Sequence, residues 1–279
     1  MNAFRIPSGA AVPRLGQGAW RMGDSRRRHA EELRALEVGI ELGLTLIDTA
    51  EMYGSGGSEE LVAEAIAGRR ESVYVVSKVL PTNASRRGTI EACEQSLARL
   101  RTDYLDLYLL HWRGGYALED TLDAFAELQQ RGAIRHFGVS NFDCADLEEA
   151  WSLRHGTVIA ANQVLYNLEE RGIEWDLLPR CCERGVPIMA YSPLGSDSAR
   201  LRKHATLATI AARHDATPSR IALAWLLRQP NVIVIPKASS EAHVRDNRAA
   251  LDLTLTSDDL AEIDRAFPPP TAAEPLAML

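Results

Sequence analysis

The chain has 279 residues, of which 46% are hydrophobic and 25% are charged, and its formal net charge is −7 at pH 7. This balance is typical of a globular protein with a full core, and its acidity argues against a nucleic-acid or anionic-membrane partner, because such partners favour a basic surface. No apolar run approaches the roughly 18 residues that a membrane span needs, and the start of the chain lacks the apolar segment of a signal peptide.

The first segment with a structural signal, residues 4–16, predicts a β-hairpin that turns at Ser8-Gly9. Apolar stretches that favour strands then recur along the chain, at residues 13–18, 44–48, 73–78, 105–111, 135–141, 158–163, 186–191 and 231–237. Most of them have a continuous apolar centre without polar alternation, which is typical of parallel strands buried on both faces.

Amphipathic helical patterns separate these strands, among them residues 29–42, 85–100, 118–132 and 217–229. Thr217 and Pro218 predict the start of the last helix, as N-cap and first helical residue. Eight strand-then-helix units without a linker predict one α/β domain over residues 1–279, a (β/α)8 TIM barrel whose floor is closed by the N-terminal β-hairpin. A six-stranded doubly wound sheet is the alternative. The Pro- and Ala-rich residues after Phe267 are expected to be irregular.

Polar residues end most of the expected strands. They are Asp48, Lys78, His111, Ser140-Asn141, Asn162-Gln163, Tyr191 and Lys237. Any one of them has a simple structural explanation, because strand ends meet solvent. A barrel, however, brings the carboxyl ends of its strands to one rim, where the active sites of this fold lie. Lysine is also scarce, since only Lys78, Lys203 and Lys237 occur among 31 basic residues, and two of these three belong to the set.

Asp48, Tyr53, Lys78 and His111 suit the delivery of a proton to a carbonyl oxygen. The ordinary pKa of tyrosine, about 10, is too high for an efficient acid at neutral pH, and a nearby ammonium lowers it. Lys78 can supply that charge, Asp48 can keep Lys78 protonated, and His111 can orient the carbonyl or relay a proton. These four residues can supply the proton that a carbonyl reduction needs. The reduction also needs a hydride, which requires a nicotinamide cofactor.

The glycine cluster GSGGSEE, residues 54–60, lacks the spacing of a Rossmann phosphate-binding loop. Its two glutamates would repel a pyrophosphate, so we interpret the cluster as a flexible loop in which Ser58 caps the following helix. The run Arg26-Arg27-Arg28 is interpreted as a solvated face, although it could meet an acidic substrate.

At these residues the sequence resembles the aldo-keto reductase superfamily along essentially its whole length. The motifs that carry the resemblance are LGQGAW (15–20), DTAEMYG (48–54), SK (77–78), LYLLHW (107–112), GVSNF (138–142), NQVLYN (162–167), YSPLG (191–195) and IPKAS (235–239). The likeness is greatest to short bacterial members that reduce 2-oxoaldehydes such as methylglyoxal, or that resemble the 2,5-diketogluconate reductases. It implies a barrel that binds NADPH extended across its rim, with NADH as a weaker alternative.

The resemblance implies a role for each of the candidate residues. Tyr53 is the expected proton donor, with Lys78 and Asp48 as its tuning pair, and His111 is expected to orient the carbonyl. The expected cofactor-binding residues are Asp48, Ser140, Asn141, Gln163, Tyr191, Ser192, Leu194, Ser196, Lys237, Ser239, Ser240, His243, Asp246 and Asn247. Ser140, Asn141 and Gln163 are expected to hold the carboxamide, and Tyr191 to stack on the nicotinamide ring. Ser192, Leu194 and Ser196 are expected to follow the pyrophosphate. Lys237, Ser239 and Ser240 are expected at the 2′-phosphate, with Asp246 and Asn247 near the adenine. His243 stands where the family usually has an arginine.

The expected substrate-binding residues are Trp20, Met52 and Trp112, together with His111. For Met52, core packing is an equally good interpretation. The segment HWRGGYALED, residues 111–120, and the C-terminal segment are both short, which predicts an open substrate pocket.

Two other functions are consistent with the fold. A cofactor-binding regulatory subunit would keep the nicotinamide site with little turnover, but no docking extension is visible in this sequence. A metal-dependent isomerase would need several carboxylates and histidines at the strand ends, and Asp48 and His111 beside Lys78 do not suit a divalent cation, so no metal is expected. The four cysteines, at positions 93, 144, 181 and 182, form no C-x-x-C motif. They are interpreted as reduced thiols of a cytoplasmic monomer that acts on a small carbonyl compound.

Overall fold

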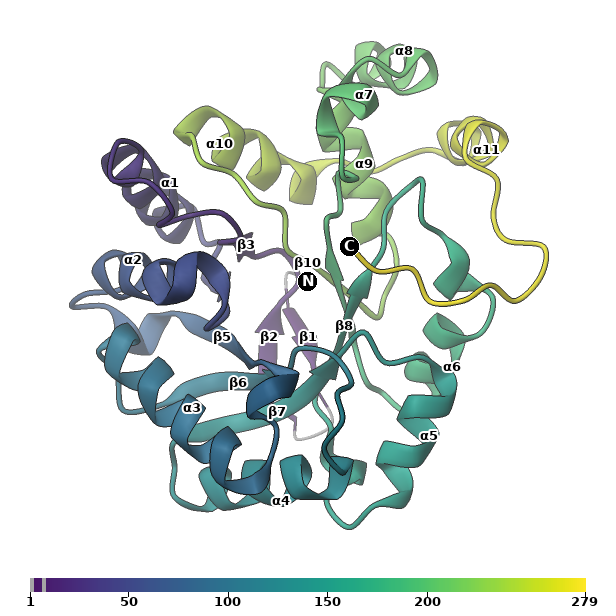
Figure 1. Cartoon of the computed structure of the whole chain (residues 1–279). Helices are drawn as coiled ribbons and strands as arrows, with labels where there is room; N and C mark the ends of the chain where they lie inside the picture. Colours follow the sequence, from purple (N-terminus) through teal and green to yellow (C-terminus); the bar gives the residue numbers. More distant parts are fainter. Residues whose placement is uncertain (1–2, 7–8) are drawn as a thin grey trace.

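The computed structural model of the chain describes residues 3–6 and 9–279. It begins with an antiparallel hairpin of β1 (Ala3–Arg5) and β2 (Ala11–Pro13), seen behind the rest of the molecule in Figure 1. Of the predicted turn at Ser8-Gly9, Ser8 lies outside the described residues. Gly9 has a φ of 84°, in the left-handed region that glycine adopts without steric cost.

Eight parallel strands follow and form the barrel predicted from the sequence. They are β3 (Gln17–Gly18), β4 (Leu46–Asp48), β5 (Tyr74–Val79), β6 (Leu105–Leu110), β7 (Ile134–Ser140), β8 (Asn162–Leu165), β9 (Ile188–Tyr191) and β10 (Val232–Val234). Each strand pairs in parallel with the next one along the chain. Parallel bridges from Leu15 to Val234 and from Gly18 to Lys237 join the first strand to the last. This closure excludes the alternative of an open doubly wound sheet.

Helices surround the strands, as Figure 1 shows. They are α1 (His29–Glu41), α2 (Gly57–Ala65), α3 (Arg86–Leu100), α4 (Leu118–Gln130), α5 (Cys144–Ser152), α6 (Leu177–Glu183), α7 (Ser198–Arg202), α8 (Ala205–Arg213), α9 (Pro218–Leu227), α10 (Glu241–Ala249) and α11 (Ser257–Ala266). The predicted start of α9 is confirmed, because Thr217 accepts a hydrogen bond from the amide of Arg220 and Pro218 is the first helical residue. None of the helices in the described part of the chain is long and apolar enough to cross a membrane.

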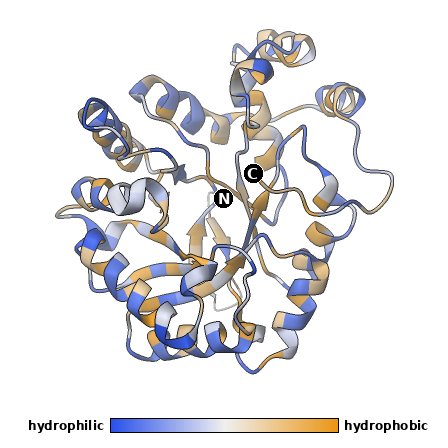
Figure 2. Cartoon of the chain, viewed as in Figure 1, coloured by the Kyte–Doolittle hydropathy of each residue, from blue (hydrophilic) through white to orange (hydrophobic). Residues whose placement is uncertain are grey.

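Apolar side chains form two clusters, one between the strands and the helices and one inside the barrel. Figure 2 shows the strands as the most continuously hydrophobic segments. The inner cluster includes Ile6 and Val12 from the N-terminal segment, packed with Leu46, Val76 and Leu107 from the strands. The hairpin therefore covers the floor of the barrel, as the sequence predicted.

Two strands differ most from their predicted bounds, whereas the ends of the others shift by at most three residues. The predicted strand 13–18 is divided, because Pro13 belongs to β2 of the hairpin and only Gln17 and Gly18 form β3. The predicted strand 158–163 begins later, at Asn162, because residues 156–158 form a short 3-10 helix. Asn162 and Gln163 therefore begin β8, although the preceding Ala160 already bonds to the carbonyl of Phe137 in β7. A shift of this kind is common where an apolar run continues beyond the strand itself.

The C-terminal tail after α11 is irregular, as its composition predicts. Figure 1 shows that the tail returns from α11 toward the centre of the barrel, so that the C-terminus lies near β8 in this view. The backbone of Leu279 lies close enough to the hydroxyl of Tyr191, at the end of β9, to lower its pKa against the effect of burial. The tail therefore reaches the rim at which the candidate residues lie.

Candidate active site

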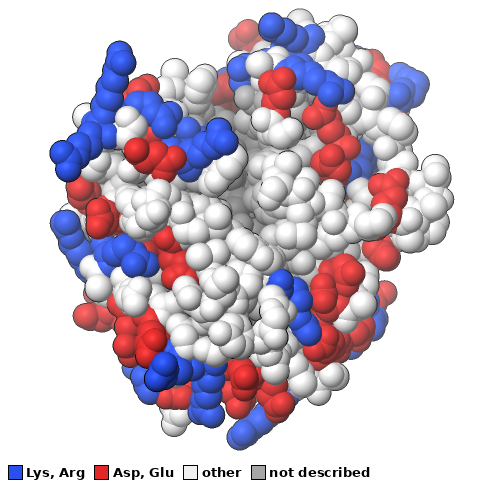
Figure 3. All heavy atoms as spheres, in the orientation of Figure 1, with Lys and Arg blue, Asp and Glu red and all other residues white. Residues whose placement is uncertain are grey.

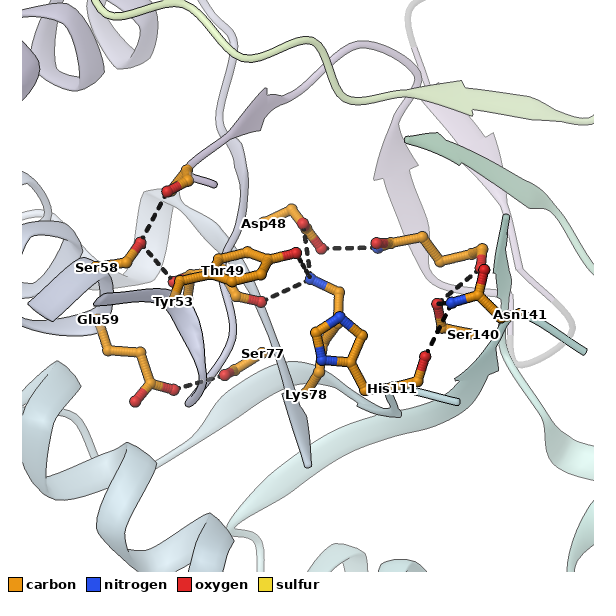
Figure 4. A network of polar contacts seen from close by, with 12 residues as sticks. Asp48, Thr49, Tyr53, Ser58, Glu59, Ser77, Lys78, His111, Ser140 and Asn141 are labelled. Atoms are coloured by element: carbon orange, nitrogen blue, oxygen red, sulfur yellow. Dashed lines mark hydrogen bonds and ion pairs between the residues drawn. The ribbon is translucent and has the colours of Figure 1, made fainter. Parts of the chain in front are cut away.

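Lys78 lies near the end of β5 with its side chain fully buried. Its ammonium donates three hydrogen bonds, to Asp48 Oδ2 at 2.8 Å, to the carbonyl oxygen of Thr49 at 2.8 Å and to the hydroxyl of Tyr53 at 3.3 Å (Figure 4). An ammonium has three donors, so all of them are used within the protein. Lys78 can therefore act on a bound molecule only through its effect on Tyr53.

Burial and charge compete over the protonation of this group. Burial favours the neutral amine of Lys78, but Asp48 and Tyr53 together outweigh it and raise the pKa of Lys78, so the ammonium persists. For Tyr53 the balance is reversed, because burial raises its pKa more than the charge of Lys78 lowers it. The prediction from the sequence that Lys78 lowers the pKa of Tyr53 is confirmed. The predicted net direction of the Tyr53 pKa shift is wrong, because the sequence could not show that the phenol is buried.

His111 follows β6 and lies beside Tyr53, with ring centroids 5.9 Å apart and an interplanar angle of 71°. Burial, with a smaller contribution from the charge of Lys78, lowers the pKa of His111 to about 2. The imidazole is therefore neutral throughout the working range of pH. Its Nδ1 atom is buried without a hydrogen-bond partner among the described residues, so Nε2 is the atom left to contact a ligand.

A second set of hydrogen bonds connects Asp48 to the opposite wall of the barrel. Gln163 Nε2 donates to Asp48 Oδ1 at 2.7 Å, so the carboxylate joins Lys78 to β8. Asn141, just after β7, donates to the carbonyl oxygen of His111 at 3.1 Å and to Ser140 Oγ at 3.2 Å. The Tyr191 hydroxyl donates to Asn141 Oδ1 at 3.0 Å. These polar side chains form one connected rim, as Figure 4 shows for part of it.

The loop that carries Tyr53 is fastened from beneath by buried polar groups. Ser58 donates to the carbonyl oxygen of Ala19 at 3.0 Å and accepts from Thr49 Oγ1 at 2.9 Å. The N-cap of α2 is Gly56, so the predicted capping role of Ser58 is wrong. Ser58 is instead completely buried between the loop and the barrel.

Glu59 provides another buried anchor for α2. One of its carboxylate oxygens accepts from Ser77 Oγ at 2.6 Å and the other from Arg99 Nε at 2.6 Å. Ser77 is the neighbour of Lys78, so α2, α3 and β5 are tied together directly beneath the site (Figure 4). Sequence reasoning assigned none of these contacts. The only signal was the position of Glu59 in the first turn of a helix, where an acid is also expected for electrostatic reasons.

The outer candidate positions lie on the loop after β9 and around the start of α10. Ser192, Leu194 and Ser196 belong to that loop, and the carbonyl oxygen of Ser192 accepts from Asn167 Nδ2 at 3.0 Å. Ser240 is the N-cap of α10 and accepts from the amide of His243 at 3.5 Å.

Three side chains on α10 point in different directions. His243 is exposed and Asn247 is buried. Asp246 is turned toward α9, where it accepts from Thr217 Oγ1 at 2.6 Å and pairs with Arg220 at 2.7 Å. Asp246 is therefore already engaged within the protein, which the spacing of these residues did not reveal.

The expected substrate-binding residues follow the carboxyl ends of β3, β4 and β6. Trp20 and Met52 are 48% and 42% exposed, so neither is a core residue. Trp112 packs beside His111, with ring centroids 4.8 Å apart. Figure 3 shows a hollow in the centre of this face, bordered mainly by uncharged side chains. The exposure of Met52 removes its alternative interpretation as a core residue.

Similarity to known proteins shows the family of this chain. The model of the aldo/keto reductase family matches residues 14–267. The chain belongs to this family. It is 50% identical over 273 residues to methylglyoxal reductase YeaE of Escherichia coli, with 96% of each chain covered. It is 31% identical to the glyoxal reductase of Bacillus subtilis over 264 residues, with 94% of this chain and 92% of that protein covered.

A solved structure is also very similar to this aldo/keto reductase. It is an aldo-keto reductase from Klebsiella pneumoniae in complex with NADPH, with a TM-score of 0.97 and 46% identity. The match covers 100% of this chain and 99% of that one. Within residues 3–6 and 9–279 of the present aldo/keto reductase, no group of three or more His, Cys, Asp or Glu side chains is placed to hold a metal ion.

Proposed function

We propose that this aldo/keto reductase reduces small aldehydes and ketones, above all 2-oxoaldehydes such as methylglyoxal and also aromatic aldehydes, with NADPH as the reductant. The observation that carries the proposal is the buried Lys78 ammonium, bonded at once to Asp48 and to the Tyr53 hydroxyl. The relative that is 50% identical is a methylglyoxal reductase, and the similar Klebsiella structure contains NADPH. Both support this choice of substrate and cofactor.

The polar rim fits such a cofactor. Gln163 uses its amide nitrogen on Asp48 and keeps its amide oxygen for a carboxamide, which Ser140 and Asn141 would also contact. Tyr191 is held by its hydroxyl, so its ring can stack on the nicotinamide. We assign Ser192, Leu194 and Ser196 to the pyrophosphate, Lys237, Ser239, Ser240 and His243 to the 2′-phosphate, and Asp246 and Asn247 to the adenine. Lys237 is half-buried and has no ion-pair partner among the described residues, as expected of a cation that awaits an anion.

The chemistry then follows from the protonation states of the side chains. NADPH, when bound, supplies the hydride. Neutral His111 donates its Nε2–H to the carbonyl oxygen and holds it near Tyr53. Tyr53 gives its proton to that oxygen as negative charge develops, and the Lys78 ammonium stabilises the phenolate that remains. Asp48 keeps Lys78 charged and in place.

The test of this proposal is steady-state NADPH oxidation with a panel of carbonyl compounds that includes methylglyoxal and 4-nitrobenzaldehyde. Tyr53→Phe removes the acidic hydroxyl and keeps the ring, so we expect kcat to fall by at least about 10²-fold while the affinity for NADP⁺ is retained. A Phe variant that kept more than about a tenth of the wild-type kcat would refute the role of Tyr53. Wild-type protein that binds NADPH without turnover of any compound would instead indicate a regulatory subunit.

We also propose that the protein is a cytoplasmic monomer. The four cysteines are free, and burial raises the pKa of Cys93 and of Cys181 to about 12, which keeps these thiols protonated. A reducing compartment suits such thiols. Gel filtration coupled to light scattering checks the monomer, and a mass twice that of one 30.7 kDa chain contradicts it.

A further inference from the structure

The segment between β3 and α1 carries an arginine run that has no role in the site described above. Arg28 is the residue immediately before α1. Gly18, at the end of β3, forms a parallel bridge with Lys237, so this segment leaves the barrel beside Lys237. Further along, α1 lies next to α10 (Figure 1), and Arg34 Nε is 4.0 Å from Glu241 Oε2. The start of α1 and the start of α10 therefore flank Lys237 on the rim.

Several charges act on Lys237 from this direction. Burial is the main cause that lowers the pKa of Lys237. The charges of Arg28 and Arg21 lower this pKa further, whereas those of Glu32 and Asp24 raise it. All four come from the segment after β3 or from α1. The guanidinium groups of Arg28 and Arg21 are therefore close enough to the Lys237 ammonium to lower its pKa. Figure 3 shows basic side chains gathered beside the central hollow on the side of α1 and α10.

A buried carboxylate lies behind these cations. Glu32 is completely buried on α1, and its Oε2 atom accepts from the amide of Gly23 at 3.0 Å. Its Oε1 atom has no hydrogen bond and lies 3.5 Å from Arg28 Nε. Buried charges need a partner, so Glu32 holds the Arg28 side chain toward the rim. At the centre of the barrel, the buried carboxylate of Asp48 likewise pairs with the ammonium of Lys78.

We propose that Arg28 is a second phosphate-binding cation, which together with Lys237 holds the 2′-phosphate of NADPH, with Glu32 as the residue that positions it. This inference rests on the proposed function. The guanidinium forms paired hydrogen bonds with phosphate oxygens, and a lysine acts as a point charge, so the two cations complement each other. A cation supplied by the residue before α1 also accounts for the exposed His243 on α10, because an arginine at that position is then not required.

The test measures affinity for ligands with and without the 2′-phosphate. Isothermal titration gives the Kd of NADP⁺, NAD⁺, 2′-AMP and 5′-AMP for wild type, for Arg28→Gln and for the neighbouring control Arg27→Gln. Loss of one charge-assisted contact is expected to raise the Kd of NADP⁺ and of 2′-AMP about tenfold in Arg28→Gln. The Kd of NAD⁺ and of 5′-AMP is expected to stay within about twofold of wild type, and Arg27→Gln is expected to leave all four nearly unchanged.

Two results overturn the assignment of Arg28. One is an unchanged Kd of NADP⁺ in Arg28→Gln, and the other is an equal loss of affinity for NADP⁺ and NAD⁺, which indicates damage to the fold. Because Arg28→Gln leaves the buried Glu32 without its cation, Arg28→Lys is measured as well and is expected to recover part of the affinity for 2′-AMP. Wild-type protein that fails to bind any of these nucleotides refutes the proposed function itself. If wild type binds NADP⁺ and Arg28→Gln binds it with the same Kd, only this inference is refuted.

Discussion

At the scale of single residues, Lys78 illustrates why this protein keeps a lysine where it otherwise uses arginine. Its compact ammonium satisfies Asp48, Thr49 and Tyr53 at once in a fully buried position. A guanidinium is planar and larger, and its five donors cannot all be satisfied by three acceptors. The position therefore requires both the charge and the shape of lysine.

Lys78→Arg should consequently lower kcat by at least about 10²-fold, because the phenolate of Tyr53 loses a correctly placed positive charge. The matched control is Lys203→Arg, since Lys203 is exposed. It lies just after α7, as the C-cap residue of that helix. The same steady-state assay is used for both variants. Similar activity of the two would remove the reason to single out Lys78.

The pH dependence of the reaction is a second expectation at this scale. Tyr53 acts as an acid, so the active form is the protonated one, which predominates below its pKa, and burial has raised that pKa. The pKa of His111 lies at about 2, so His111 does not titrate in the working range. The value of kcat/KM for reduction should therefore be flat from about pH 5 to about pH 9 and should fall only above that range. A limb near pH 6.5 that disappears on mutation of His111 would show that the histidine titrates.

At the scale of elements, two loops meet beneath the candidate site. The segment after β3 approaches the start of α2 so closely that a Cβ on Gly23 would lie 2.3 Å from the carbonyl oxygen of Gly57. Gly23 also has a φ of 79°. The first loop carries Trp20, and the second follows Tyr53. Their contact therefore sets the distance between a wall of the pocket and the proton donor.

Gly23→Ala should force these two loops apart. Gly43→Ala is the control, because Gly43 has a similar φ of 86° but open space around its Cβ position. The control should cost about 1–2 kcal/mol of unfolding free energy from backbone strain alone, and Gly23→Ala about 1–3 kcal/mol more from the steric clash. Urea denaturation measures the difference, and kcat should fall only in Gly23→Ala. Equal stability of the two variants would mean that the loops can separate without cost.

At the scale of the whole molecule, barrel closure brings together residues that lie far apart in the chain. Asp48 and Gln163 are separated by 115 positions and share a hydrogen bond of 2.7 Å. On the same rim, Trp20 and Met52 are exposed, and the C-terminal tail brings the backbone of Leu279 close to Tyr191. The sequence predicted an open pocket with short loops and did not predict this contact of the tail.

A pocket of this kind should accept small or flat carbonyl compounds. Methylglyoxal and 4-nitrobenzaldehyde should be reduced with good kcat/KM, and a steroid ketone should be a poor substrate, because too few walls surround it to offset the cost of ordering a large ligand. The measurement is kcat/KM for each compound at saturating NADPH. A steroid ketone reduced more efficiently than both small aldehydes would contradict this description of the pocket.

The sequence by itself determined the barrel and most of the polar strand ends, because both depend on local patterns. The exception is the pair Asn162 and Gln163, which begins β8 instead of ending it. Continuous apolar runs indicate buried parallel strands wherever they occur, and Thr217 before Pro218 marks a helix start without reference to the rest of the fold. The ion pair between Asp48 and Lys78 also followed, since neighbouring parallel strands end at the same rim. Family motifs added the expected role of each residue.

Only the tertiary structure decided how these groups are supported and how their charges balance. The anchors at Ser58 and Glu59 depend on partners from other elements, such as Arg99, which is 40 positions away. The net pKa of Tyr53 depends on its burial, which outweighs the nearby ammonium. The effect of the Arg28 charge on the pKa of Lys237 requires the first and last strands to be joined. Desolvation and long-range pairing are properties of the folded chain, and no local pattern encodes them.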